Sequence, residues 1–204
     1  MEERRLQFGV RSGATTGGAS WNPGNAATFS KTIGSLTITI KALPSPAKLY
    51  WDATDGFGVK NSGSNGYETD EIESKEILKI TFSAPVILNR IYVSDLFIEQ
   101  ASGYTYKEKG FYQVDGNAKT SFLATQPTGT NGERWVDIDA TANCLFLTAP
   151  GKVFSKNCYW QNHEFSLAML DITPTPEPAA MALLGVGVGI AGVAFARRRK
   201  RARG

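Results

Sequence analysis

The chain has 204 residues, of which 42% are hydrophobic and 11% aromatic, and its net charge at pH 7 is +3. The positive balance arises at one end, because the stretch from Arg197 onward holds six of the 22 basic residues and none of the 19 acidic ones. Residues 1–196 therefore carry a net charge of −3, and a mildly acidic domain of this kind has no electrostatic footprint for nucleic acid. The length is sufficient for one domain with a substantial core.

The first 32 residues predict a poorly structured segment or a single edge strand. Residues 1–6 are mostly charged, and residues 10–32 are rich in Gly, Ala, Ser, Thr and Asn, which is typical of loops. No run of seven apolar residues of the kind found in a secretory signal peptide occurs before residue 20. We therefore expect the natural start to lie upstream of Met1, in which case residues 1–9 need not have a structural role.

Residues 33–172 predict a β-sandwich. Apolar and polar residues alternate over 36–41 and 78–82, the period-2 pattern of half-buried strands, and Pro44 and Pro46 should end the first of them. Turn-forming residues dominate 51–66, which predicts loops. Further strand candidates are 86–93, 111–114, 121–124, 135–138, 144–147 and 165–172. Short strands separated by turns are typical of an all-β sandwich, and eight or nine of them favour a jelly-roll arrangement.

Acidic residues gather in two turn-rich stretches ahead of the strand at 78–82. Calcium binds six to eight oxygen atoms from carboxylates, carbonyls and water, and loops that fold acidic side chains inward suit it. The candidate ligands for a structural calcium ion are Asp52, Asp55, Asp70, Glu71 and Glu73. Their spacing does not match an EF-hand, so solvated acidic loops remain the alternative.

Several aromatic residues lie in or near turns and could form a platform for a sugar ring. They are Trp51, Tyr104, Tyr106, Trp135, Tyr159 and Trp160. Tyr104 and Tyr106, between Gly103 and Lys107, are the best candidates for exposed glycan contacts. Packing in the core is the alternative for all six.

Catalytic residues are not apparent. His163 is the single histidine, and neither a Gly-x-Ser-x-Gly nor a His-Glu-x-x-His pattern surrounds it, so we expect a polar surface histidine. We therefore predict a protein that is not an enzyme. The two catalytic carboxylates of a glycoside hydrolase are brought together by the fold and have no fixed spacing in the sequence. A glycoside hydrolase therefore stays an alternative.

Cys144 and Cys158 are the two cysteines of the chain. In an oxidising compartment they could form a disulfide that stabilises the fold by about 3 kcal/mol. Two buried thiols are the alternative.

Residues 179–196 form an apolar run of 18 residues, and a helix of that length spans about 27 Å, close to the hydrocarbon thickness of a bilayer. We expect a single transmembrane helix there. It is followed by a basic cluster that should stay in the cytoplasm, with residues 1–178 outside: Arg197, Arg198, Arg199, Lys200, Arg201 and Arg203. A plain tail anchor or a core helix are the alternatives.

Prolines at alternate positions precede this run and predict an extended spacer without backbone hydrogen bonds. The order of Pro176-Glu177-Pro178, the apolar span and the arginine cluster at the C-terminus resembles the PEP-CTERM protein-sorting signal of Gram-negative bacteria. The resemblance covers residues 173–204. It implies recognition by exosortase, an integral-membrane enzyme that cuts near the Pro-Glu-Pro motif, and a place in exopolysaccharide and biofilm systems.

A second resemblance covers about 40 residues of the predicted sandwich. It rests on Asp55-Gly56-Phe57-Gly58-Val59, on the acidic stretch 70–73, on the strand before Phe82 and on Val93-Ser94-Asp95-Leu96. These segments are similar to ectodomains often found with the PEP-CTERM signal. The resemblance implies a jelly-roll, galactose-binding-like sandwich.

We therefore expect an exported protein of the cell surface or extracellular matrix that passes through the cell membrane. Exosortase, membrane lipid and exopolysaccharide are its expected partners, and calcium is its one possible cofactor. A carbohydrate-binding module with a specific glycan ligand is the first alternative, and a polysaccharide-acting hydrolase is the second.

Overall fold

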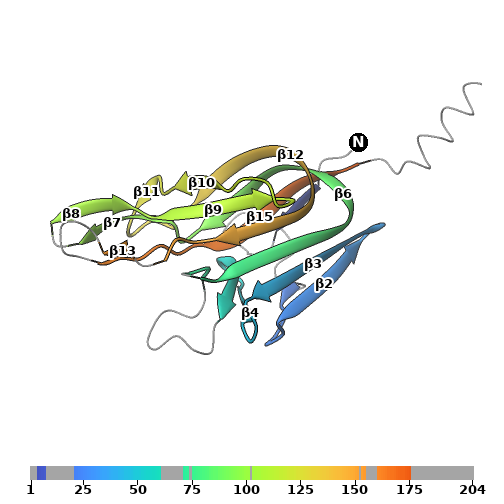
Figure 1. Ribbon diagram of the computed structural model, residues 1–204, viewed down its shortest axis with the longest axis horizontal. Coiled ribbons are helices and arrows are strands. Elements are labelled where there is room, and N and C mark those ends of the chain that lie inside the picture. The colour runs from blue at the N-terminus through green and yellow to red at the C-terminus, as the bar shows by residue number, and fades with distance from the viewer. Residues whose placement is uncertain are drawn as a thin grey trace, which may run out of the picture. The chain divides into compact units, whose positions relative to one another are not determined.

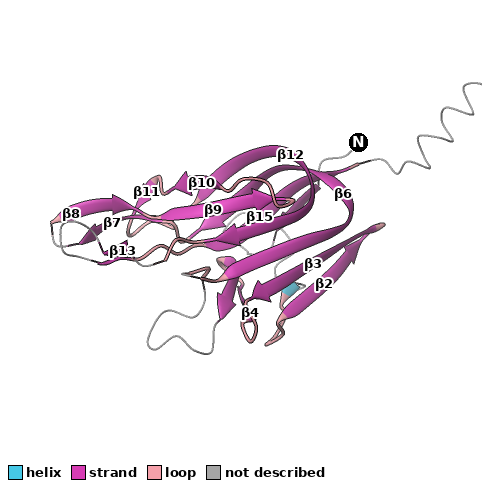
Figure 2. Cartoon of the chain, viewed as in Figure 1, coloured by secondary structure: helices cyan, strands magenta, loops and turns pink. Residues whose placement is uncertain are grey.

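The computed structural model describes residues 4–7, 21–60, 71–73, 75–101, 103–151, 153–154 and 160–175. The chain divides into two compact units, Met1–Pro174 and Thr175–Gly204. In the described part of the first unit, β-strand is the dominant structure (Figure 2), which confirms the all-β prediction. No described helix is long and apolar enough to span a membrane. The predicted transmembrane helix at 179–196 lies outside the described residues.

Two long strands organise the fold. β6 (Ile77–Ser94) and β12 (Arg134–Thr148) pair in antiparallel fashion along most of their length. The pairing shifts register between Ala142 and Cys144, and β6 turns back on itself at the matching place (Figure 1). Each of these strands therefore contributes one half to each of two layers.

The first layer contains the first half of β6 and the last residues of β12. β3 (Leu36–Leu43) pairs with residues 77–82 of β6, while residues 144–148 of β12 pair with the other edge. The remaining strands of this layer are β2 (Thr28–Ile33), β9 (Lys109–Val114) and β10 (Thr120–Leu123). The strand order is therefore β2-β3-β6-β12-β9-β10.

The second layer contains the other halves of β6 and β12. β15 (Ser166–Pro174) pairs with residues 86–94 of β6. The free edge of β15 is shared by β1 (Arg4–Gln7), which pairs with residues 169–172, and by β5 (Gly56–Lys60), which pairs at Leu167. β4 (Lys48–Asp52) forms a hairpin with β5.

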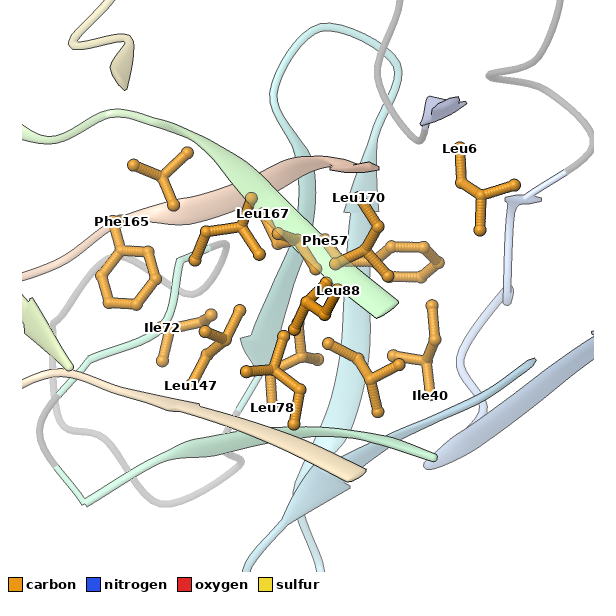
Figure 3. Close-up of a cluster of buried hydrophobic side chains, with 14 of the residues drawn as sticks. Leu6, Ile40, Phe57, Ile72, Leu78, Leu88, Leu147, Phe165, Leu167 and Leu170 are labelled. Carbon is orange, nitrogen blue, oxygen red and sulfur yellow. The ribbon is translucent and has the colours of Figure 1, made fainter. Parts of the chain in front are cut away.

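One hydrophobic core lies between the layers. Both halves of β6 contribute to it, since Leu78 and Leu88 are fully buried in the same cluster as Leu147, Leu170 and Phe57 (Figure 3). Alternation explains this: in β3 every second residue is buried and its neighbours are partly or fully exposed. Each fully buried aliphatic side chain contributes roughly 1.5–3 kcal/mol, so the long strands are held by contacts on both layers.

Asp115 fixes the register shift in β12. Its carboxylate accepts hydrogen bonds from the amides of Asn143 (3.0 Å) and Cys144 (2.7 Å), and its own amide donates to the Cys144 carbonyl at 3.0 Å. A β-bulge leaves backbone groups unpaired by the neighbouring strand. One side chain at the end of β9 satisfies those groups and holds the strand at the point where it passes from one layer to the other.

A small sheet continues from the end of β6. β7 (Phe97–Ala101) pairs with β8 (Tyr104–Lys107) and, in parallel, with β11 (Gln126–Pro127). β13 (Val153–Phe154) and β14 (Trp160–Gln161) form a separate two-stranded sheet.

Three expectations about the strands need correction. Residues 1–9 were not expected to need a structural role, but β1 pairs with β15 and buries Leu6 to 6% exposure. Residues 51–66 were expected to be loop, but β5 occupies 56–60. β15 ends at Pro174 rather than at 172, so the spacer expected from residue 173 begins inside the sheet.

Candidate functional site

The C-terminal end of β15 is where the folded domain meets the tail. Thr173 pairs with Ile87 and Pro174 with Val86, and Thr175 is the last described residue. Arg4 lies opposite Ile172, so β1 starts beside the place where the tail begins. Pro176, Glu177, Pro178 and the basic cluster 197–203 lie outside the described residues. The sorting residues therefore follow the last paired residue of the sheet after a single intervening position.

The opposite end of β15 carries most of the remaining candidates. Ser166 pairs with Ser94 at that end, and a strand from 166 to 174 is about 26 Å long. The loop from β6 into the small sheet and the β4–β5 hairpin meet there, since Ser94 Oγ donates to the Asp55 carbonyl at 2.8 Å. The candidate binding residues thus lie about a strand length from the start of the tail.

An acidic pocket of about 160 Å³ opens at this end. Its lining residues are Tyr50, Asp52, Asp55, Glu71, Asp95 and Ser166. Asp52 Oδ1 accepts hydrogen bonds from the amides of Thr54 (2.5 Å) and Asp55 (3.2 Å), so the β4–β5 turn fixes this carboxylate. Asp95 joins the pocket from the end of β6 with a φ of 58°.

The pocket brings together three of the five predicted calcium ligands, Asp52, Asp55 and Glu71. Glu73 is used differently: it is buried, and its amide donates to Glu76 Oε2 at 2.9 Å. Asp70 lies outside the described residues. Nowhere in the part of the chain that the structure describes do three His, Cys, Asp or Glu side chains lie close enough together to hold a metal ion. The calcium site stays a prediction.

Tyr104 and Tyr106 lie two residues apart on β8 and so share one face of the small sheet. Tyr104 is 46% exposed. Tyr106 is half-buried, and its ring meets the His163 ring edge-on with centroids 6.1 Å apart. Burial raises the pKa of Tyr106 to about 12. Exposure as a glycan contact therefore suits Tyr104 better than Tyr106.

A second, more open pocket of about 380 Å³ lies along β7 and β11. It is lined by Ile98, Glu99, Gln100, Pro127 and Thr128. Thr128 Oγ1 donates to Glu99 Oε1 and to the Ile98 carbonyl, both at 3.2 Å. These bonds fasten the β11 segment to β7 and fix the pocket wall.

Glu108 is a buried carboxyl group that sequence reasoning did not single out, because Lys107 and Lys109 make the segment look solvated. It is 2% exposed, and its Oε2 accepts a 2.7 Å hydrogen bond from the Phe97 amide. Its own amide donates to the Phe97 carbonyl at 3.0 Å. Burial raises the pKa of Glu108 to about 9, with a further contribution from neighbouring carboxylates. Glu108 is therefore protonated at neutral pH and fastens β7 to the turn between β8 and β9.

The expectation that His163 is a surface residue is wrong. Its side chain is 6% exposed, because it precedes β15 and packs under Tyr106. Burial lowers the pKa of His163, and Lys109 lowers it further. The neutral imidazole is thus a packing residue.

Cys144 is a free, half-buried thiol. Its sulfur lies 3.9 Å from Thr81 Oγ1, and burial raises the pKa of the thiol. Cys158 lies outside the described residues. The disulfide is absent from this structure and stays a prediction for the oxidised protein.

No curated protein and no solved structure matches this chain significantly. One family model does match: the PEP-CTERM protein-sorting motif, over residues 174–200. The match begins at Pro174, the last residue of β15. A motif of this kind implies export with membrane transit and processing by an exosortase. The all-β domain is therefore joined directly to a tail that is a PEP-CTERM protein-sorting motif.

Proposed function

We propose that this chain is a non-enzymatic protein of the cell surface or extracellular matrix that associates with exopolysaccharide after an exosortase has processed its tail. The observation that carries the proposal is the match of residues 174–200 to the sorting motif, starting where the last strand ends. In this arrangement a cut in the Pro-Glu-Pro region removes the tail and leaves every paired residue of β15 in the released domain.

The finer architecture belongs to the same proposal. The two layers joined by β6 and β12 support a jelly-roll-like sandwich, and the apolar run at 179–196 supports a transmembrane helix whose basic end stays in the cytoplasm. A structural calcium ion stays part of the proposal, although Asp52, Asp55 and Glu71, which line the acidic pocket, do not lie close enough together in this structure to hold it jointly.

Expression of the gene from its natural start in a host with an exosortase tests the sorting step. We expect intact-mass analysis of the wild-type protein to find a chain that ends near Glu177 in the matrix or medium. We expect Glu177→Ala to remain uncut in the membrane fraction, and Asp137→Ala, an exposed acid on β12, to behave as wild type. Recovery of the uncut wild-type chain, arginines included, as a soluble cytoplasmic protein contradicts the proposal.

A carbohydrate-binding module with a specific ligand is the second candidate, favoured by the exposure of Tyr104 beside the pocket-lining strand β7. Glycan-array binding that is lost in Tyr104→Ala and retained in Leu123→Ala, another exposed apolar residue, supports this candidate. A polysaccharide-acting hydrolase is the third. Release of reducing sugar from native exopolysaccharide supports it if Glu99→Gln abolishes the release.

A further inference from the structure

The outward face of the first layer carries three parallel rows of side chains across up to five neighbouring strands. The register places Ser30, Thr39, Thr81 and Cys144 in the first row. The second row is Thr28, Lys41, Lys79, Phe146 and Gln113. The third is Leu43, Ile77, Thr148, Phe111 and Ser121, of which Thr148 is buried among its neighbours. With strands about 4.8 Å apart, the second row is about 19 Å long.

Lys41 and Lys79 stand directly opposite each other in this face. Like charges in directly opposed positions destabilise a sheet, yet the three rows contain no carboxylate. Neither lysine forms an ion pair with another side chain of the described ranges. The second row is therefore cationic. One exposed carboxylate, Asp115, borders the first row at Cys144, while the acidic pocket and the buried Glu108 belong to other parts of the domain.

Two aromatic rings lie in the same face. Phe146 is half-buried, with Lys79 Nζ 5.4 Å from its ring centroid. Phe111, on the neighbouring strand and diagonal to Phe146, has Lys109 Nζ 5.0 Å from its ring centroid. Each of the two phenyl rings thus has an ammonium group near it. The serine and threonine hydroxyl groups and the Gln113 amide lie on the same face of the sheet.

We propose that this face binds an acidic polysaccharide. Its carboxylate groups lie against Lys41, Lys79 and Lys109, while the apolar faces of its sugar rings pack on Phe111 and Phe146. Serine and threonine hydroxyls and the Gln113 amide oxygen suit the sugar hydroxyls, while the Gln113 amide nitrogen donates to the Asn117 carbonyl at 2.6 Å. A lipid surface fits less well, since a membrane-binding face inserts protruding apolar side chains and these rings are half-buried. The proposal rests on the proposed function and names the polymer class and the surface.

Affinity electrophoresis of the full-length chain in a non-ionic detergent tests the proposal, with polygalacturonate in one gel and dextran in another. We expect retardation by polygalacturonate only, decreasing as salt is raised. Lys41→Gln/Lys79→Gln should weaken binding about fivefold, the size expected for two exposed ion pairs. Phe146→Leu should weaken it without changing its salt dependence.

The β4–β5 hairpin supplies a matched control. Lys48 and Lys60 are also exposed and directly opposed, but they lie in the second layer. Lys48→Gln/Lys60→Gln removes the same charge and should leave binding unchanged. Equal weakening by both double variants overturns the proposal, because net charge alone then explains retention.

Other outcomes also overturn it. They are absence of retardation by polygalacturonate, equal retardation by dextran, tighter binding to phosphatidylglycerol vesicles, and self-association that depends on Lys41 and Lys79. Failure here is distinguishable from failure of the proposed function, because export and tail processing are read from mass and fractionation. A protein that is cut and exported normally but ignores polygalacturonate contradicts this inference alone.

Discussion

Arg90 Nε donates a 2.9 Å hydrogen bond to Asp171 Oδ2 and so joins the second half of β6 to β15. The Asp171 side chain is fully buried, whereas that of Arg90 is 30% exposed. The guanidinium carbon lies 4.3 Å from the Trp135 ring centroid, which holds the cation in place. The pair therefore neutralises a buried charge in the strand that leads into the tail.

Replacing Arg90 with methionine should destabilise the domain more than replacing Asp171 with asparagine. The first change leaves a buried carboxylate without its cation, and the second removes the buried charge itself. Breaking a fully buried pair costs 3–5 kcal/mol, and the partial exposure of Arg90 reduces this to about 2–3 kcal/mol. Urea unfolding measures both variants. Equal losses in the two variants contradict this reasoning.

Glu108 should make stability fall as the pH rises. Its folded-state pKa of about 9 lies above the ordinary glutamate value of 4.5, so the folded state holds a proton that the unfolded state has lost. The stabilisation is complete below pH 4.5 and is lost as pH rises towards about 9.

Unfolding between pH 7.5 and 9 tests this effect. The pKa of His163 is lowered from 6.5 and that of Glu76 is raised to about 7, so neither group contributes much in that interval. We expect Glu108→Gln, which keeps an oxygen for the Phe97 amide, to reduce the slope. The Cys144 thiol, whose pKa burial raises, accounts for a remaining slope of the same sign. Asp137→Asn, on an exposed side chain, should leave the wild-type slope intact.

Gly56 allows the β4–β5 turn to approach β15. Its φ is 102°, and a Cβ added there would lie 2.2 Å from the Leu167 carbonyl oxygen. Gly56→Ala should cost about 1–2 kcal/mol for the backbone conformation and about 1–3 kcal/mol for the clash. Gly116 has a φ of 79° with open space around it. Gly116→Ala should therefore cost only the free energy of the backbone conformation. Thermal unfolding of the two variants separates conformation from packing.

Leu6 should contribute to stability although it lies near the start of the chain. It is 6% exposed and packs in the core from β1. Leu6→Ala should destabilise the domain by about 2–3 kcal/mol. Leu123→Ala removes the same atoms from a side chain that is 42% exposed and should cost less than about 0.5 kcal/mol. A neutral result for Leu6→Ala in guanidinium unfolding shows that β1 is dispensable.

Strands that are buried on one face were predictable from the sequence. Alternation located β3 and the first half of β6, because each presents apolar residues to the core and polar residues to solvent. β5 was missed, since its residues 56–59 are all buried and two of them are glycines. Without alternation, Asp-Gly and Gly-x-Gly indicate only turns.

The continuity of β6 was also beyond local reasoning. Ala84-Pro85 predicts a break, since proline lacks an amide proton. The strand continues because β12 shifts register over the same stretch, between the pairs at Thr81 and Val86. Which residues oppose one another is set by pairing across more than 50 positions of sequence, and no local pattern encodes it.

The candidate sites also differ in whether a local sequence pattern or long-range strand pairing creates them. The sorting motif is a linear order of proline, apolar and basic residues, so the sequence alone revealed it and the family comparison confirmed it. The acidic pocket needed Asp95 beside Asp52, and the cationic face needed Lys41 opposite Lys79. Both are products of strand register. The burial of His163 was not predicted, because the residues next to a single buried polar residue form no sequence pattern that indicates its burial.

The junction between β15 and the tail has a mechanical consequence. β15 is bonded along one edge to β6 from Ser166 to Pro174, so a pull at Thr175 directed along the strand loads these pairs in shear, all at once. A pull perpendicular to the strand would break the β15–β6 pairs one after another. A load applied to the tail along this direction is therefore shared by the whole β15–β6 pairing, and the attachment point withstands more force than it would if the pairs opened one after another.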